Sequence, residues 1–104
     1  MSRTKDLVDY VVAAVADITE IPCRTIMSKC SRAEVVDARH IAVMLLHNAG
    51  LYSMVIADHM RITPRYVQYI VTDFADRIAC NRLLRIKYEQ TANKLRNDLE
   101  ITAS

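Results

Sequence analysis

The chain has 104 residues, of which 52% are hydrophobic and 25% are charged, and its formal net charge is only +2. This composition excludes an intrinsically disordered chain and a polybasic tail for nucleic acid, and the length fits one domain with its own core. One glycine and two prolines mark few turns, which favours long helices over many short strands. We therefore expect a single all-α domain over residues 1–104, with a core at about 4–79 and a helical extension at about 80–100.

The cysteines and the short apolar runs predict the cellular compartment of the chain. Cys23, Cys30 and Cys80 form no C-x-x-C pair, and Asp6 and Asp9 interrupt any signal-peptide-like segment. No apolar run approaches the roughly 18 residues that a membrane-spanning helix needs. These features predict a reduced, cytoplasmic protein without membrane contact. The spacing of Cys23 and Cys30 matches no common zinc site, so we expect no metal and no other cofactor.

Three helices are predicted before residue 50. Residues 4–19 carry one apolar face, and Pro22 ends that helix; a short helix follows at 23–28. Ser31 and Glu34 have the spacing of a capping box and predict a helix over 32–49, with Gly50 just beyond its end. The predicted buried stripe of this helix consists of Val35, Ala38, Ile41, Ala42, Leu45 and Ala49.

Residues 53–72 have the pattern of a helix-turn-helix. Thr63 is a favourable N-cap, and Pro64 fits the first helical position, where the missing N–H has no partner anyway. The helix that follows has a predicted core face of Val67, Ile70, Val71, Phe74 and Ile78. Its opposite face carries Arg65, Gln68, Tyr69 and Thr72. Arginine, glutamine and tyrosine can contact bases or phosphates when such a helix enters the major groove.

The turn between these two helices departs from the usual pattern. Arg61 occupies a place that commonly holds glycine, so it must either avoid a positive φ or accept strain. A long helix is expected to continue to about Leu99, with or without a break near Asn81. The apolar side of this helix has coiled-coil spacing at Tyr88, Ala92, Leu95 and Leu99. This spacing predicts that the apolar side is covered either by the domain itself or by a second copy, as a homodimer through this helix.

A basic segment precedes the helix-turn-helix. Lys29, Arg32 and Arg39 could hold the phosphates of a duplex as positioning contacts, although simple solvation of all three side chains is the alternative. The first helix is acidic by comparison, and such asymmetry suits a protein with one DNA-facing side.

The order of these elements resembles the C-terminal DNA-binding domain of the bacterial replication initiator DnaA, in the Trp-repressor-like class of all-α folds. The resemblance covers residues 7–78 and is strongest at 28–42, which reads S-K-x-S-R-x-x-x-V-x-A-R-x-I-A; residues 50–57 resemble the start of the family's helix-turn-helix. It implies that Lys29 and Arg32 lie in a basic loop and that Arg39 contacts phosphate. The family's signature G-x-D-H-T-T-V reads R-I-T-P-R-Y-V at 61–67, so Thr63, Pro64, Arg65 and Tyr66 stand where the family reads bases. Recognition of the replication-origin box therefore does not follow.

We thus predict an all-α helix-turn-helix domain of about five helices with a long C-terminal helix, which binds duplex DNA as a regulator of transcription or replication. The predicted DNA contacts are Lys29, Arg32, Arg39, Thr63, Arg65, Tyr66, Gln68 and Tyr69. No catalytic constellation or phosphate-cradling glycine motif is present, so we do not expect an enzyme. The alternative is a protein-interaction or regulatory module that kept the fold and lost DNA binding.

Overall fold

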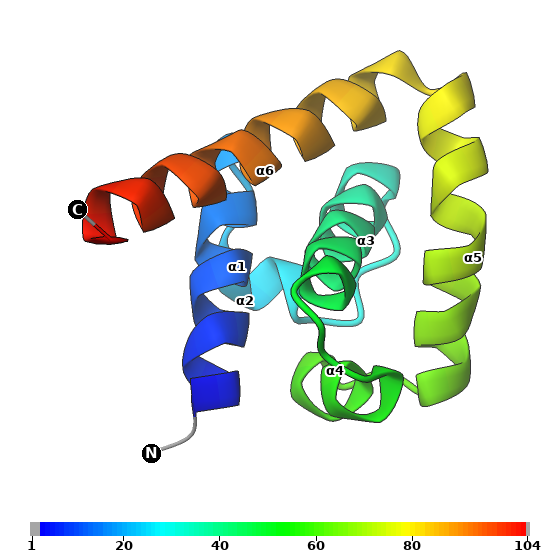
Figure 1. The fold of residues 1–104 in the computed structure, drawn as a ribbon. Coiled ribbons are helices and arrows are strands. Elements are labelled where there is room, and N and C mark those ends of the chain that lie inside the picture. Colours follow the sequence, from blue (N-terminus) through cyan, green and yellow to red (C-terminus); the bar gives the residue numbers. More distant parts are fainter. Residues whose placement is uncertain (1–2, 104) are drawn as a thin grey trace.

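Helix α3 (Ala33–Asn48) lies at the centre of the fold, and the other helices surround it (Figure 1). The computed structural model describes the backbone of residues 3–103 and the side chains of residues 3–97. Helix α3 is buried on nearly all sides, as expected for a helix without a strongly polar face. Its buried residues are Val35, Ala38, Arg39, His40, Ile41, Ala42, Val43, Leu45 and Leu46.

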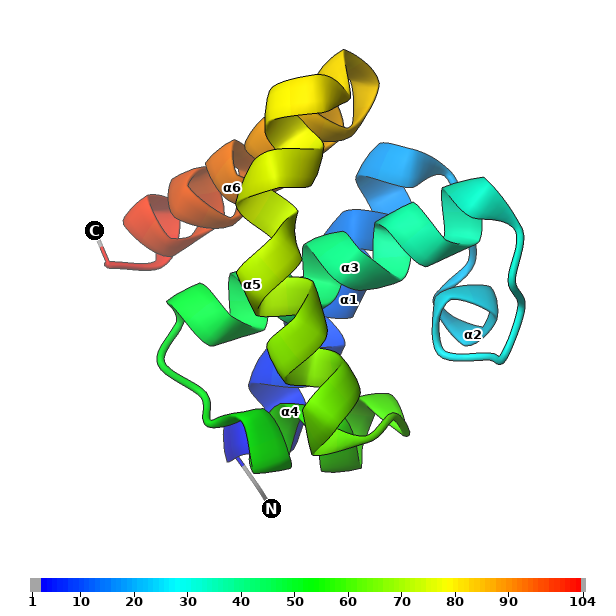
Figure 2. The same cartoon turned by 90° about the vertical axis from the view of Figure 1, so that its right-hand side faces the viewer.

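Five further helices cover α3 from different directions (Figures 1 and 2). Helices α1 (Arg3–Thr19) and α5 (Pro64–Cys80) flank it on opposite sides; in Figure 1, α4 (Ser53–Met60) lies below it and α6 (Arg82–Ala103) crosses above it. The short helix α2 (Cys23–Ile26) packs beside α1 and α3. Residues 3–103 contain no strand, which confirms the predicted all-α class, with six helices instead of about five.

The two ends of α3 differ in how well the sequence predicted them. The prediction of a capping box at Ser31 and Glu34 is wrong, because the N-cap residue is Arg32, one residue later than expected, and no side chain caps the helix. Glu34 instead lies 3.5 Å from the Arg32 guanidinium. At the other end Gly50, with φ +98°, follows the helix as predicted. The N–H groups of Gly50 and Leu51 donate to His47 and Leu46 at 3.0 and 3.2 Å, which is the Schellman pattern.

Helix α6 begins after a break at Asn81 and returns across the core. Asn81 Oδ1 accepts from the Leu84 N–H at 3.0 Å, so this residue caps the new helix. Leu84 is 2% exposed, and Tyr88 packs its ring against Phe74 with centroids 5.0 Å apart.

The predicted coiled-coil seam of α6 is used inside the domain. Tyr88, Ala92 and Leu95 pack against the domain's own core, whereas the side chain of Leu99 lies outside the described residues. An ion pair between Lys94 and Asp17, at 3.3 Å, also joins α6 to α1. The part of the seam that favoured a homodimer is therefore already covered by this chain.

Candidate nucleic-acid interface

Helices α4 and α5 form a helix-turn-helix at the predicted residues. Thr63 Oγ1 accepts from the Tyr66 N–H at 3.1 Å, and Pro64 is the first residue of α5, as the sequence predicted. Ala57 and Met60 are buried where the two helices approach each other. Arg61 ends α4 with φ 59° and ψ 42°, so it accepts the left-handed conformation that the sequence left open.

Helix α5 divides sharply into a buried and an exposed face. Val67, Ile70 and Phe74 are each at most 2% exposed. Arg65, Gln68, Tyr69 and Thr72 are exposed on the other side, which confirms the predicted division. The first half of α5 is therefore held by its apolar side and leaves its polar side accessible.

Two residues on this outer face are held by neighbours. The Gln68 amide donates to the Ser53 hydroxyl at the start of α4, which fixes Gln68 across the two helices. Tyr69 is 58% exposed and stacks on Tyr66, with centroids 6.2 Å apart and planes inclined by 10°. This stacking holds the Tyr69 ring outward at the surface.

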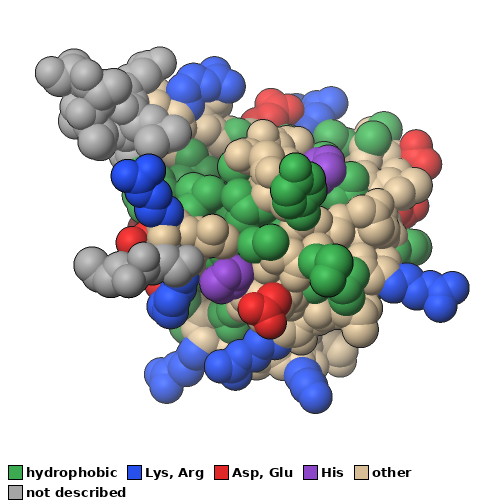
Figure 3. Space-filling model, turned by 60° about the horizontal axis from the view of Figure 1, so that its bottom comes forward, with side chains coloured by type: hydrophobic (Ala, Val, Ile, Leu, Met, Phe, Trp, Pro, Cys, Tyr) green, Lys and Arg blue, Asp and Glu red, His purple; other side chains and the backbone are tan. Residues whose placement is uncertain are grey.

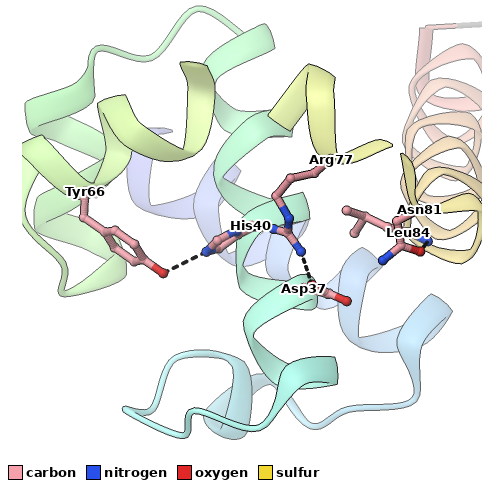
Figure 4. Close-up of polar contacts among 6 residues, drawn as sticks. All are labelled: Asp37, His40, Tyr66, Arg77, Asn81 and Leu84. Carbon is pink, nitrogen blue, oxygen red and sulfur yellow. Dashed lines mark hydrogen bonds and ion pairs between the residues drawn. The ribbon is translucent and has the colours of Figure 1, made fainter. Parts of the chain in front are cut away.

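The hydroxyl of Tyr66, a predicted DNA contact, belongs to a network inside the domain (Figure 4). Tyr66 Oη lies 2.8 Å from His40 Nε2, and Arg77 Nη1 lies 2.6 Å from His40 Nδ1. Arginine can only donate, so Nδ1 accepts and Nε2–H donates to the tyrosine oxygen. Arg77 also pairs with Asp37. The network ties the middle of α3 to the first and last turns of α5.

The electrostatics of this network keep His40 neutral. Burial, followed by the neighbouring positive charge of Arg77, lowers the pKa of His40 to about 4, and the Asp37 carboxylate opposes this only in part. A neutral imidazole can accept from Arg77 and donate to Tyr66 at the same time. The Tyr66 hydroxyl therefore joins α5 to α3, and its ring contacts Tyr69.

Arg39 is the clearest correction to the predicted contacts. It is 7% exposed, and its guanidinium donates to the carbonyl oxygens of Ile26, Ser28 and Cys30 at 2.9, 2.6 and 3.1 Å. It therefore cannot hold a phosphate at the surface. The reason is that α3 is surrounded on nearly all sides and offers no open face at this position. Arg39 instead fixes the α2–α3 loop from inside.

The loop that Arg39 holds carries the other predicted basic contacts. Lys29 and Arg32 are both exposed, and the Arg32 side chain retains 69% of its accessible surface beside Glu34. This loop and the α4–α5 turn lie on the same side of the molecule, to the right in Figure 2. Figure 3 shows the face formed by α4 and the first turns of α1 and α5, with Lys and Arg side chains along its edges and apolar side chains near its middle.

Neither comparison with known proteins nor a metal-binding group assigns a function to this chain. No protein-family model matches the chain, and no curated protein is similar enough to count as a relative. Within the described part of the chain, no group of three or more His, Cys, Asp or Glu side chains could hold a metal ion, and Cys23, Cys30 and Cys80 are free thiols. None of the helices described is both long and apolar enough to cross a membrane.

Proposed function

We propose that this chain binds double-stranded DNA through the helix-turn-helix of residues 53–72. The observation that carries the proposal is the solvent-exposed outer face of α5, where Arg65, Gln68 and Tyr69 are exposed while the opposite face is buried. A major groove admits an α-helix, and arginine and glutamine can pair with guanine and adenine edges there. Thr63 stands beside them, although its side-chain oxygen already accepts from the Tyr66 N–H.

Lys29 and Arg32 supply the backbone contacts in this proposal. Both are exposed on a loop whose shape Arg39 fixes, so their ammonium and guanidinium groups can reach phosphates without reordering the loop. As two phosphate contacts they contribute a slope of about −1.8 in log K against log salt concentration, which is roughly 12-fold in affinity between about 50 and 200 mM salt.

The sequence resemblance to the DnaA C-terminal domain supports duplex DNA as the ligand. The changed signature at residues 61–67 indicates a target other than the replication-origin box. The role of regulator in transcription or replication follows from the same resemblance, and the protein acts in it as a binding domain without catalysis.

A gel shift of the full chain on a mixed-sequence duplex at low salt tests the proposal. We expect retardation below about 100 μM protein, the weak end of ordinary non-specific affinity, with the salt dependence given above. Arg32→Ala should weaken binding to this duplex, whereas Arg85→Ala on α6, at an exposed arginine that also lies beside a glutamate, should not. The absence of retardation at that concentration would contradict the proposal.

A protein-interaction module is the second candidate, and the apolar surface next to α5 favours it. Tyr52 is 81% exposed and Met54 is 74% exposed, both at the start of α4. Large exposed apolar side chains that lie close together often mark a partner surface. The near-neutral net charge of +2 also suits a partner that is not a polyanion. Failure to shift any duplex would favour this candidate over DNA binding.

A further inference from the structure

A surface hollow of about 490 Å³ lies between the first turns of α1, the helix α2 and the end of α4. Arg24, His59 and Arg61 line it from α2, α4 and the α4–α5 turn, and Ser28 contributes a hydroxyl group. Lys5 and Asp9 also line it and form an ion pair with each other at 2.8 Å. The charges that remain after this pairing are the guanidinium groups of Arg24 and Arg61, so the hollow has an excess of positive charge.

The backbone of Arg61 gives a reason to connect this hollow with function. A non-glycine residue in the left-handed helical region costs roughly 1–2 kcal/mol, and glycine would remove that cost. The conformation itself is needed, because it lets the Ile62 N–H donate to the Ala57 carbonyl at 3.0 Å and ends α4. An arginine at this point therefore contributes nothing to the turn that glycine would not supply better.

The side chain of Arg61 has no structural role that would explain its presence. It is exposed, and within the part of the chain whose side chains are described it forms no hydrogen bond or ion pair. Non-glycine residues in the left-handed region cluster at functional sites. Glu20, after α1, has the same conformation with φ 60°, but it does not line a basic hollow. The strain and the basic hollow coincide at the same residue.

We propose that this hollow is a binding site for a backbone phosphate of nucleic acid, with Arg61 as its main ligand and Arg24 as the second. The site lies next to the turn that leads into α5, so a strand whose phosphate occupies it runs alongside the groove that receives α5. This inference rests on the proposed DNA binding and adds a contact that does not read sequence. Arginine suits the role because its planar group can bind phosphate through two parallel N–H donors.

The test uses substitutions at Arg61 that separate strain from charge. Arg61→Gly and Arg61→Asn remove the charge, and both glycine and asparagine tolerate the left-handed conformation. Arg61→Lys keeps the charge and the strain. Arg82→Asn at the start of α6 removes an exposed arginine at the opposite end of the molecule and serves as the matched control (Figure 1).

Each variant is measured by thermal melting and by titration of a labelled mixed-sequence duplex at three salt concentrations. We expect Arg61→Gly to melt no lower than the unaltered protein and to bind every duplex about 5–10-fold more weakly at 0.1 M salt, with a salt slope smaller by about 0.9. Arg61→Asn should lose affinity in the same way. Arg61→Lys should retain most of the affinity, and Arg82→Asn should bind normally.

The outcomes distinguish this inference from the function on which it rests. If the unaltered protein binds duplex and Arg61→Gly binds it with the same affinity and salt slope, the phosphate site is refuted while DNA binding stands. If the unaltered protein binds no duplex, both proposals are refuted. Equal weakening by Arg82→Asn would show a general charge effect and would also overturn the site.

Discussion

Replacing Arg39 with alanine tests the role that the structure assigns to this residue, which is to hold the α2–α3 loop. The hydrogen bond from Nε to the Ile26 carbonyl is buried, and a bond of this kind from a charged donor contributes about 1.5–3 kcal/mol. The bonds to Ser28 and Cys30 are part-buried, so water can replace the donor and together they add about 1 kcal/mol. We therefore expect Arg39→Ala to lower the free energy of unfolding by about 3 kcal/mol.

Thermal melting followed by circular dichroism measures this loss. A decrease of about 3 kcal/mol corresponds to a fall in melting temperature of roughly 10–20 °C for a domain of this size. Arg32→Ala is the matched control, since Arg32 is an exposed arginine at the N-cap of the same helix, and we expect it to change stability by no more than about 0.5 kcal/mol. If both variants melt within about 2 °C of the unaltered protein, the internal role of Arg39 is refuted.

Two further predictions concern the core. His40 has a folded-state pKa of about 4, below its ordinary value of 6.5, so the unfolded chain takes up a proton first as the pH falls and stability is lost between those values. His40→Gln should reduce this loss in urea unfolding at about pH 7 and pH 5, and an unchanged pH dependence would contradict the neutral histidine. Leu84→Ala should cost about 2–5 kcal/mol because α6 closes the core, whereas Leu83→Ala, at a side chain 65% exposed, should cost little. Equal costs would show that α6 is not packed as described.

The sequence predicted α5 well because one face of this helix is apolar and the other polar. With Thr63 and Pro64 at its start, the periodicity located both the helix and the exposed side chains. Gly50 was also identified as a boundary because its conformational freedom acts locally, whereas the break near Asn81 was left open. Helix faces and local boundaries of this kind can be predicted from residue spacing and residue type alone.

Helix α3 was harder to interpret because it is buried almost all round. A single stripe of apolar residues left Arg39 on a supposed outer face, although Val43 and Leu46 did not fit that stripe and are fully buried. These two residues were the available signal that α3 is enclosed. The contacts of Arg39 with loop carbonyls 9–13 residues away could not be deduced from periodicity, because they depend on how α2 packs.

The network of His40, Tyr66 and Arg77 was missed for a related reason. Its members lie 26 and 37 residues apart, and only the packing of α5 against α3 brings them together. From the sequence alone, Tyr66 was therefore interpreted as a further DNA contact beside Arg65. The hollow at Arg61 likewise joins three elements, and only the unusual residue at the turn pointed to it.

The central claim is that the outer face of α5 reads DNA, and selection from a random duplex pool tests it most directly. The unaltered protein should enrich a shared sequence motif, and Arg65→Ala should lose discrimination at about one base position, worth about 1–3 kcal/mol, while it still binds unselected duplex. A pool without any enriched motif, or the same motif recovered with equal strength by Arg65→Ala, would contradict the account.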